Sequence, residues 1–396
     1  MSFYEEPSFF IFLAFAAIPA FIRGYLEKPL KRYGFVVSVC FLLLLFAREP
    51  VALACLVGYV ALSAAVTFCL LSQVRKEGSC DARHRWVGIV CLATPLALYK
   101  ISEVFSASLL GFIGISYITF KAIQVFLEVG DGVIEKMNLF DYVYFLVFFP
   151  VFTSGPIDRS QRFIDDINTV LPREKYLDLF GRGLLLLLLG AVYKVVLATV
   201  ANGFYTPQAS GGDPVGISLL CAIGDSYAYG FYLFFDFAGY SLMAMGAGAL
   251  LGVHVPRNFR APFAAIDIKD FWNRWHITLS FWLRDFVFMR FSFWATKEKL
   301  LGTRLSRACC GYIVDMGLMG LWHGITLDYV VYGLYHGMLL AANDVYQKKS
   351  RFYRKHKDGR LYKALSWFMC LNAVMFGFAL FSGQITLILG GFIHGR

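Results

Sequence analysis

Long apolar runs, separated by short polar segments, repeat along nearly the whole chain. Lipid offers no hydrogen-bond partner to a peptide group, so a segment that crosses it is expected to be helical. One crossing needs about 20 apolar residues, which leaves room for roughly ten or eleven crossings in this chain. The pattern therefore predicts an all-α polytopic membrane protein. The apolar runs cover residues 9–26, 33–47, 51–71, 86–99, 109–127, 139–153, 183–200, 217–251, 311–346 and 364–393.

Glycine and proline interrupt several of these runs. Pro150 and Pro156 should break the helix that begins near residue 139 and leave a short or re-entrant element. The run 217–251 is long enough for one or two crossings, and its small residues 244–248 would allow close helix contact. The last run, 364–393, is broken at residues 382–384, so it could cross once or fold back.

The runs form a single membrane domain over residues 1–396. Within it we distinguish N-terminal helices (1–127), a core that holds the candidate site (139–346), and a basic loop with a C-terminal apolar segment (347–396). No internal repeat and no polar domain interrupts this organisation.

Composition supports the membrane assignment. Hydrophobic residues make up 58% of the 396, and soluble domains have roughly 45–50%. The net charge of +10 is typical of the lysine and arginine excess in cytoplasmic loops. Basic loops at 23–32, 75–85 and 347–363 would then be cytoplasmic and the N-terminus extracellular. No polar domain is present to read nucleic acid. The nine cysteines show no metal-binding spacing, so we expect neither a metal nor a bound cofactor.

Two histidines are the candidates for chemistry. On a regular helix over 270–290, His276 would share a polar strip with Asn273, Ser280 and Arg284, beside an aromatic strip. The alternative is an interfacial amphipathic helix with an incidental histidine. His323 lies inside an apolar run, where an ionisable group is costly and suits proton transfer. The alternative is a buried histidine that only bonds to a neighbouring helix.

His336 is a weaker candidate. It follows His323 by thirteen residues, which is about 220° around a regular helix. It would therefore face away from the same pocket unless Gly324 or Gly333 breaks the helix.

Three motifs resemble the membrane-bound O-acyltransferases. They are residues 149–156 (FPVFTSGP), residues 274–285 (RWHITLSFWLRD), and residues 321–324 (LWHG) followed by 333–337 (GLYHG). Within that family the chain is most similar to the bacterial branch that contains the alginate acetylation protein AlgI and the teichoic acid D-alanylation protein DltB. The resemblance implies a ring of about ten or eleven tilted helices, with short interfacial helices, around a thin centre. A funnel from outside and a tunnel from inside would reach that centre, with His323 as the catalytic residue and His276 as its second histidine.

The same resemblance implies a reaction and partners. D-Alanine would pass from the phosphopantetheine thioester of an acidic carrier, DltC, on the cytoplasmic face towards lipoteichoic acid in a Gram-positive envelope. DltD and a DltX-type membrane peptide would assist. The candidates for binding substrate or an oxyanion are Asn273, Ser280, Trp322 and His276. The candidates for carrier docking are Arg284, Val287, Phe288, Met289, Arg290, Lys297 and Lys299.

Three alternatives stay open from the residues alone. The first is an AlgI-like O-acetyltransferase that acts on an exported polysaccharide. The second is a transporter without chemistry, in which the histidines form a proton relay. The third is a structural membrane subunit. For the docking segment, the plain alternative is the basic charge of any cytoplasmic loop.

Overall fold

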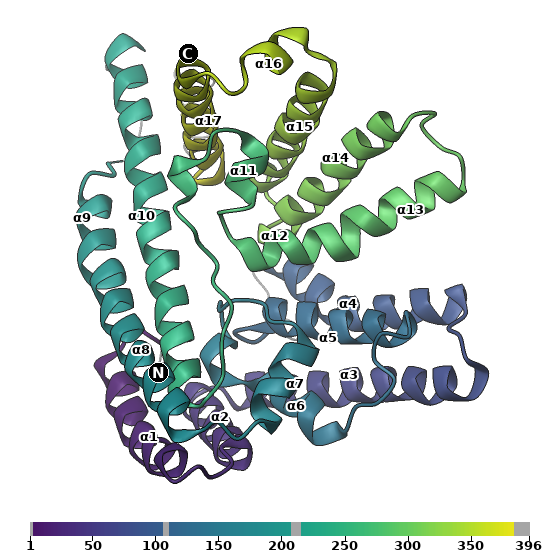
Figure 1. The fold of residues 1–396 in the computed structure, drawn as a ribbon, viewed down its shortest axis with the longest axis vertical. Helices are drawn as coiled ribbons and strands as arrows, with labels where there is room; N and C mark the ends of the chain where they lie inside the picture. Colours follow the sequence, from purple (N-terminus) through teal and green to yellow (C-terminus); the bar gives the residue numbers. More distant parts are fainter. Residues whose placement is uncertain (1–2, 106–110, 207–214, 384–396) are drawn as a thin grey trace. The chain divides into compact units, whose positions relative to one another are not determined.

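The computed structural model describes residues 3–105, 111–206 and 215–383 (Figure 1). Within these ranges the regular secondary structure is helical and no strand occurs, which confirms the predicted all-α class. The chain divides into two compact units. Unit 1 comprises Met1–Ala191 with Tyr240–Pro256, and unit 2 comprises Val192–Gly239 with Arg257–Arg396. The long helix α10, Val215–Leu250, contributes its two ends to different units.

Unit 1 contains the first eight α-helices. Their bounds are α1 Pro7–Tyr25, α2 Lys31–Leu45, α3 Pro50–Glu77, α4 Ala82–Val104, α5 Ile115–Gly130, α6 Leu139–Val147, α7 Ser160–Asn168 and α8 Arg173–Ala191. Helices α3, α4 and α5 pack against one another, and α6 packs on both α3 and α5. Helix α5 is buried along most of its length, so it forms the centre of this unit.

The helix that begins at Leu139 ends early, as Pro150 predicts. Helix α6 stops at Val147, and a 3-10 turn at Phe149–Val151 follows it. The ring of Phe149 stacks on that of Phe41 with 4.2 Å between centroids, and the hydroxyl of Tyr4 donates to the carbonyl of Pro150 at 3.1 Å. Aromatic packing therefore holds the broken segment inside the unit.

Small residues join α8 to the end of α10, as the sequence predicts. A Cβ on Gly246 would lie 2.7 Å from the carbonyl oxygen of Gly183, and a Cβ on Gly183 would lie 3.0 Å from the carbonyl oxygen of Gly246. These distances leave no room for a larger side chain at Gly183 or Gly246 without separating the helices.

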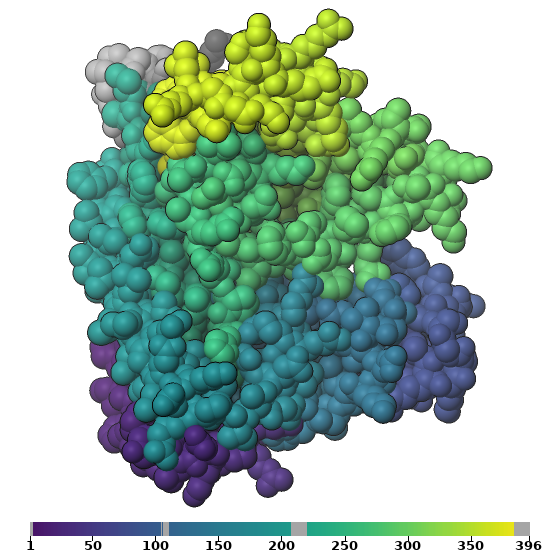
Figure 2. All heavy atoms as spheres, viewed as in Figure 1, coloured from purple at the N-terminus to yellow at the C-terminus, as the bar shows by residue number. Residues whose placement is uncertain are grey.

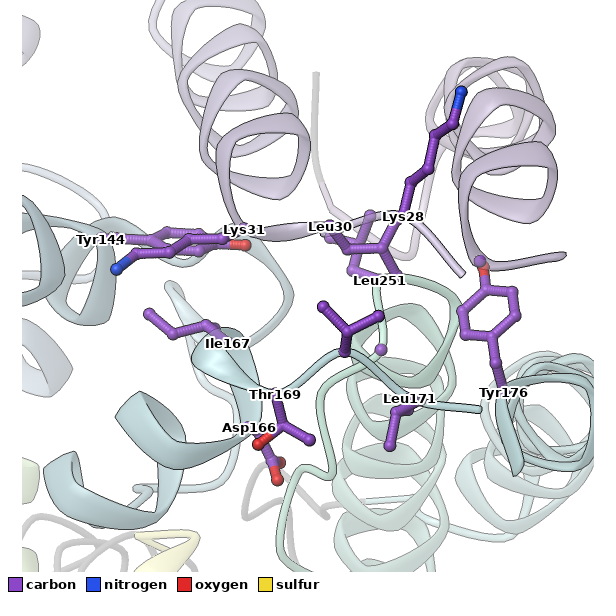
Figure 3. Close-up of a pocket in the computed structure, with 13 residues that line it drawn as sticks. Lys28, Leu30, Lys31, Tyr144, Asp166, Ile167, Thr169, Leu171, Tyr176 and Leu251 are labelled. Carbon is purple, nitrogen blue, oxygen red and sulfur yellow. The ribbon is translucent and has the colours of Figure 1, made fainter. Parts of the chain in front are cut away.

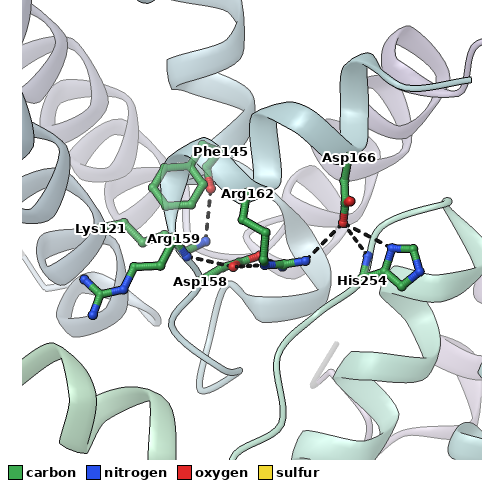
Figure 4. A network of polar contacts seen from close by, with 7 residues as sticks. All are labelled: Lys121, Phe145, Asp158, Arg159, Arg162, Asp166 and His254. Atoms are coloured by element: carbon green, nitrogen blue, oxygen red, sulfur yellow. Dashed lines mark hydrogen bonds and ion pairs between the residues drawn. The ribbon is translucent and has the colours of Figure 1, made fainter. Parts of the chain in front are cut away.

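A polar network ties α7 to the segment that follows α10 (Figure 4). The Arg162 guanidinium donates to Asp158 at 2.8 Å and to Asp166 at 3.1 Å. Asp166 also accepts from the backbone N–H of His254 at 2.8 Å, and the His254 Nδ1 lies 3.4 Å away. Beside this network is a small pocket lined by Lys28, Lys31, Tyr144, Tyr176 and Leu251 among others (Figure 3).

Unit 2 contains the remaining helices. They are the π-turn Val192–Leu197, α9 Ala198–Gly203, the 3-10 turn Pro262–Ala264, α11 Ile268–Trp272, α12 Ile277–Leu283, the π-turn Arg284–Phe288, α13 Met289–Lys297, α14 Arg304–His323, α15 Leu327–Lys349, α16 Arg351–His356 and α17 Arg360–Phe381. Helices α14 and α15 form a hairpin, and both α11 and α17 pack on α15. The predicted run 311–346 is therefore two antiparallel helices.

Six helices of the described residues are long and apolar enough to cross a membrane. In four of these helices only 17% to 28% of the apolar stretch is buried. Large apolar side chains such as Phe15, Leu188 and Met369 are exposed. Such surfaces fit lipid contact. The count of ten or eleven crossings stays a prediction, because α2 and several other helices are shorter. The predicted run 217–251 is one helix, and residues 384–393 of the last run lie outside the described ranges.

Candidate active site

His276 occupies a bend between two short helices. Its backbone is in the left-handed region, with φ 42° and ψ 50°, which a histidine rarely adopts. Helix α11 ends at Trp272 and α12 begins at Ile277. The prediction of one regular helix over 270–290 is therefore wrong, and so is the polar strip derived from it.

Hydrogen bonds to a distant segment hold the bend. The N–H of Ile277 donates to the carbonyl of Asn258 at 2.9 Å. The Asn258 side-chain oxygen accepts from the hydroxyl of Thr278 at 2.5 Å and from its N–H at 3.4 Å. The N–H of Arg260 also donates to the carbonyl of Arg274 at 3.0 Å. The N–H of Ile277 and the carbonyl of Arg274 thus bond to residues 258–260 instead of to helical partners four residues away.

The bend separates the side chains that a helix would have aligned. His276 is 4% exposed, whereas Asn273 is exposed. Ser280 donates its hydroxyl to the carbonyl of Trp275 at 3.2 Å, and Arg284 forms an ion pair with Asp285 at 2.8 Å. Among the candidates for binding substrate or an oxyanion, His276 is thus buried and Asn273 is turned to the surface.

Aromatic rings enclose His276. The ring of Phe237 lies 4.7 Å from it, edge to face, and that of Trp322 lies 6.5 Å away. Neither imidazole nitrogen of His276 has a hydrogen-bond partner among the described residues. An imidazole buried without a partner offers a free donor or acceptor to a molecule that enters the site.

His323 is the last residue of α14, next to Gly324. Its ring lies 4.5 Å from that of Trp322 and 4.9 Å from that of Phe381, and the ring of Tyr329 is stacked at 6.0 Å. His323 is half-buried. A helix end therefore presents the imidazole at the point where the chain turns back into α15.

Trp322 contacts both histidine rings. The structure thus brings together the two histidines that the sequence places 47 residues apart. A general base next to a second polar group is the arrangement that acyl transfer requires.

His336 is a buried residue of α15. Helix α14 does end next to Gly324, and Tyr332 contacts His323 at 6.2 Å and His336 at 4.7 Å. A pocket shared by the two histidines stays a prediction. His336 is fully buried, and neither of its ring nitrogens has a hydrogen-bond partner in the described ranges. Gly377 makes room for it, since a Cβ there would lie 2.5 Å from its Nε2.

The predicted docking residues lie on the π-turn Arg284–Phe288, on α13 and in the segment that follows α13. Met289, Lys297 and Lys299 are exposed; Figure 2 shows α13 and the segment that follows it in light green. Phe288 instead packs inward, stacked on Tyr312 at 4.8 Å. Val287 and Arg290 are half-buried.

Sequence reasoning missed the residues that shape the site. Asn258 gave no signal, because its partners lie about twenty residues along the chain and no short-range pattern connects them. Tyr329, Tyr332 and His336 share one side of a helix through their i, i+3 and i+4 spacing. That tyrosine spacing was the available signal.

In this helical membrane protein, one tryptophan thus contacts two histidine rings that lie 47 residues apart in the sequence. A sequence model of the MBOAT, membrane-bound O-acyltransferase family matches residues 7–384. The chain belongs to this family and is an acyltransferase.

Full-length relatives make the comparison more specific. The teichoic acid D-alanyltransferase of Streptococcus thermophilus is 36% identical over an alignment of 400 positions, which covers 97% of this chain and 95% of the relative. That of Bacillus subtilis is 35% identical, covering 96% of this chain and 98% of the relative. The probable alginate O-acetylase AlgI of Pseudomonas syringae is 31% identical over 291 residues, 72% of this chain but 51% of the relative.

Proposed function

We propose that this acyltransferase moves D-alanine from the thioester of a phosphopantetheinyl carrier protein towards lipoteichoic acid in the cell envelope. The observation that carries the proposal is the contact of His276 and His323 with one tryptophan at the end of α14. The names of the two full-length relatives support the acyl group and the acceptor.

His323 acts as the general base in this mechanism. Its imidazole takes the proton of the acceptor hydroxyl while that oxygen attacks the thioester carbonyl. The C–S bond of the tetrahedral intermediate then breaks, and the imidazolium returns the proton to the thiolate. His276, with its unpaired ring nitrogens, donates a hydrogen bond to the oxyanion. The products are an ester and a free pantetheine thiol.

The carrier protein, DltC by the resemblance to the D-alanylation system, would dock on the cytoplasmic face of the protein. The exposed Met289, Lys297 and Lys299 fit the apolar and acidic surface of such a carrier. A long, thin phosphopantetheine arm carries the thioester to a histidine that a folded carrier cannot reach. DltD and a DltX-type peptide complete the proposed set of partners.

His323→Ala tests the assignment. We expect thiol release from the D-alanyl carrier to fall by roughly 10²–10⁴-fold, the usual contribution of a general base. Thermal unfolding in detergent and carrier binding should stay as in the unsubstituted protein. Transfer that survives in this variant would contradict the catalytic role of His323.

The use of an acetyl donor distinguishes the second candidate function, O-acetyl transfer, from D-alanyl transfer. The likeness to the alginate O-acetylases extends over 72% of the chain, so O-acetyl transfer to an exported polysaccharide is the alternative. The two are compared by supplying D-alanyl and acetyl carriers to the same preparation. Exclusive use of the acetyl carrier would replace the proposal, and ion flux without any thiol release would replace both by a transporter.

A further inference from the structure

Aromatic side chains of unit 2 cover His323 on several sides. The rings of Trp322, Phe381 and Tyr329 lie 4.5, 4.9 and 6.0 Å from its imidazole. Tyr329 and Phe381 also contact each other at 5.0 Å. These three are half-buried, whereas Tyr332 is 3% exposed. The three half-buried rings therefore keep accessible surface beside the imidazole.

The backbone fixes the position of Tyr329. A Cβ on Gly324 would lie 2.4 Å from Cδ2 of that ring, so the ring rests directly on the turn between α14 and α15. Tyr329 also stands in the first turn of α15, which the hairpin holds against α14. Its ring is thus placed by the fold, before any substrate enters.

The proposed donor carries a charge that most acyl groups lack. The α-amino group of an alanyl ester has a reference pKa of about 8, so it is largely an ammonium at pH 7. It is only two bonds from the acyl carbonyl carbon. When that carbonyl reaches His323, the ammonium must therefore lie among the groups that surround the imidazole. Aromatic faces attract such cations.

We propose that Trp322, Tyr329 and Phe381 form an ammonium subsite that selects an aminoacyl group over a neutral acyl group. The proposal rests on the D-alanyl transfer proposed above and adds the residues that recognise the alanyl part. It makes these rings specificity determinants, while His323 remains the base.

A matched pair of donors tests the subsite. Full-length protein in detergent, with lipoteichoic acid as the acceptor, is supplied with carrier loaded with D-alanyl or with D-lactyl thioester, which has a hydroxyl in place of the ammonium on the same skeleton. Release of the pantetheine thiol gives kcat/KM for each donor. The quantity of interest is the ratio of the two values, because damage to the base lowers both alike.

Tyr329→Leu removes one ring and Tyr329→Phe keeps it. We expect the D-alanyl to D-lactyl ratio to fall by roughly threefold to thirtyfold in Tyr329→Leu, the range for loss of one cation–π contact. The ratio should stay within about twofold in Tyr329→Phe. If Tyr329→Leu does not fold, Phe381→Leu gives the same comparison at the adjacent ring.

An unchanged ratio in both leucine variants would overturn the subsite. If the ratio then falls in Asp328→Asn, a carboxylate and not the rings recognises the ammonium. The Asp328 carboxylate lies beside Gly383, within 4 Å of a Cβ placed there. Failure of the proposed function looks different, since the unsubstituted protein would then release no thiol from the D-alanyl carrier.

Discussion

His276 combines an unusual backbone with a buried ring. A non-glycine residue in the left-handed region costs on the order of 1–3 kcal/mol, so other contacts must stabilise it. Here the contacts come from Asn258, which accepts from Thr278 and Ile277. The strain is local to the proposed active site, where it turns the imidazole out of a helical register and towards Phe237 and Trp322.

Substitution of Thr278 tests this support. Thr278→Val keeps the shape but removes the hydroxyl that donates to Asn258 at 2.5 Å. We expect a loss of about 1–3 kcal/mol in stability, because a buried acceptor loses a donor. Transfer activity should fall as well, since the bend that holds His276 loosens.

Thr278→Ser is the matched control, because it retains the hydroxyl. Thermal unfolding and thiol release are measured side by side for the valine and serine variants. Equal behaviour of the valine and serine variants would show that this hydrogen bond does not support the site.

The sequence identified the two histidines but not their surroundings. His323 was recognisable because an ionisable residue within an apolar run is rare. His276 was placed on a helix because its neighbours have helical spacing. The bonds from Asn258 override that local preference, and a periodicity argument contains no information about such distant partners.

At the scale of elements, the hairpin of α14 and α15 positions His323. Its two helices meet through glycines: a Cβ on Gly320 would lie 2.3 Å from the Tyr329 carbonyl, and one on Gly333 would lie 2.4 Å from that of Met316. Close approach of this kind requires small residues. It also sets the distance between His323, at the end of one helix, and Tyr329, at the start of the next.

Gly320→Ala and Gly333→Ala should each force the hairpin apart. The added methyl meets a backbone carbonyl that cannot move aside, so we expect a destabilisation of about 1–3 kcal/mol. Because a displacement of about 1 Å can cost 10²-fold in rate, thiol release should fall more than stability alone explains.

Gly224→Ala provides the control within the same unit. A Cβ at Gly224, in α10, meets nothing within 4 Å, and alanine is the better helix former by about 1 kcal/mol. Its unfolding temperature should be equal or higher. A Gly320→Ala variant as stable and active as Gly224→Ala would contradict the close contact.

Element boundaries were predictable wherever a strong local signal was present. Pro150 ended α6 as expected, and the small residues near Gly246 met Gly183. The sequence did not decide whether the helix ends at Gly324 or continues through it, because glycine occurs both inside helices and at their ends. The π-turns within the helices have no sequence signature that distinguishes them from regular helix.

At the scale of the whole chain, charge and apolar surface are distributed by segment. The candidate crossings expose apolar side chains, and lysines and arginines gather in loops such as 347–363. Composition was sufficient to predict the membrane class, because it depends on sums over many residues. Composition was not sufficient to predict the number of crossings, because short helices such as α2 and α6 pack within a unit without the length of a full span.

The distribution of positive charge predicts the orientation. The loops 23–32, 75–85 and 347–363 should all lie in the cytoplasm, because lysines and arginines near the ends of spans are retained on that side. Lys357 and Arg360 in the last of these loops are exposed. Trypsin should therefore cut there in inside-out vesicles and leave the loop intact in right-side-out vesicles.

Mass spectrometry of the released peptides reads out the cleavage, with detergent-opened vesicles as the control for accessibility. An epitope placed before Glu5 should show the opposite behaviour and be detectable from outside. Cleavage of 347–363 from the outer face, or cleavage of the three loops from different faces, would overturn this topology. The proposed carrier site would then have to be sought on another surface, because the proposal places the carrier on the face that holds the basic loops.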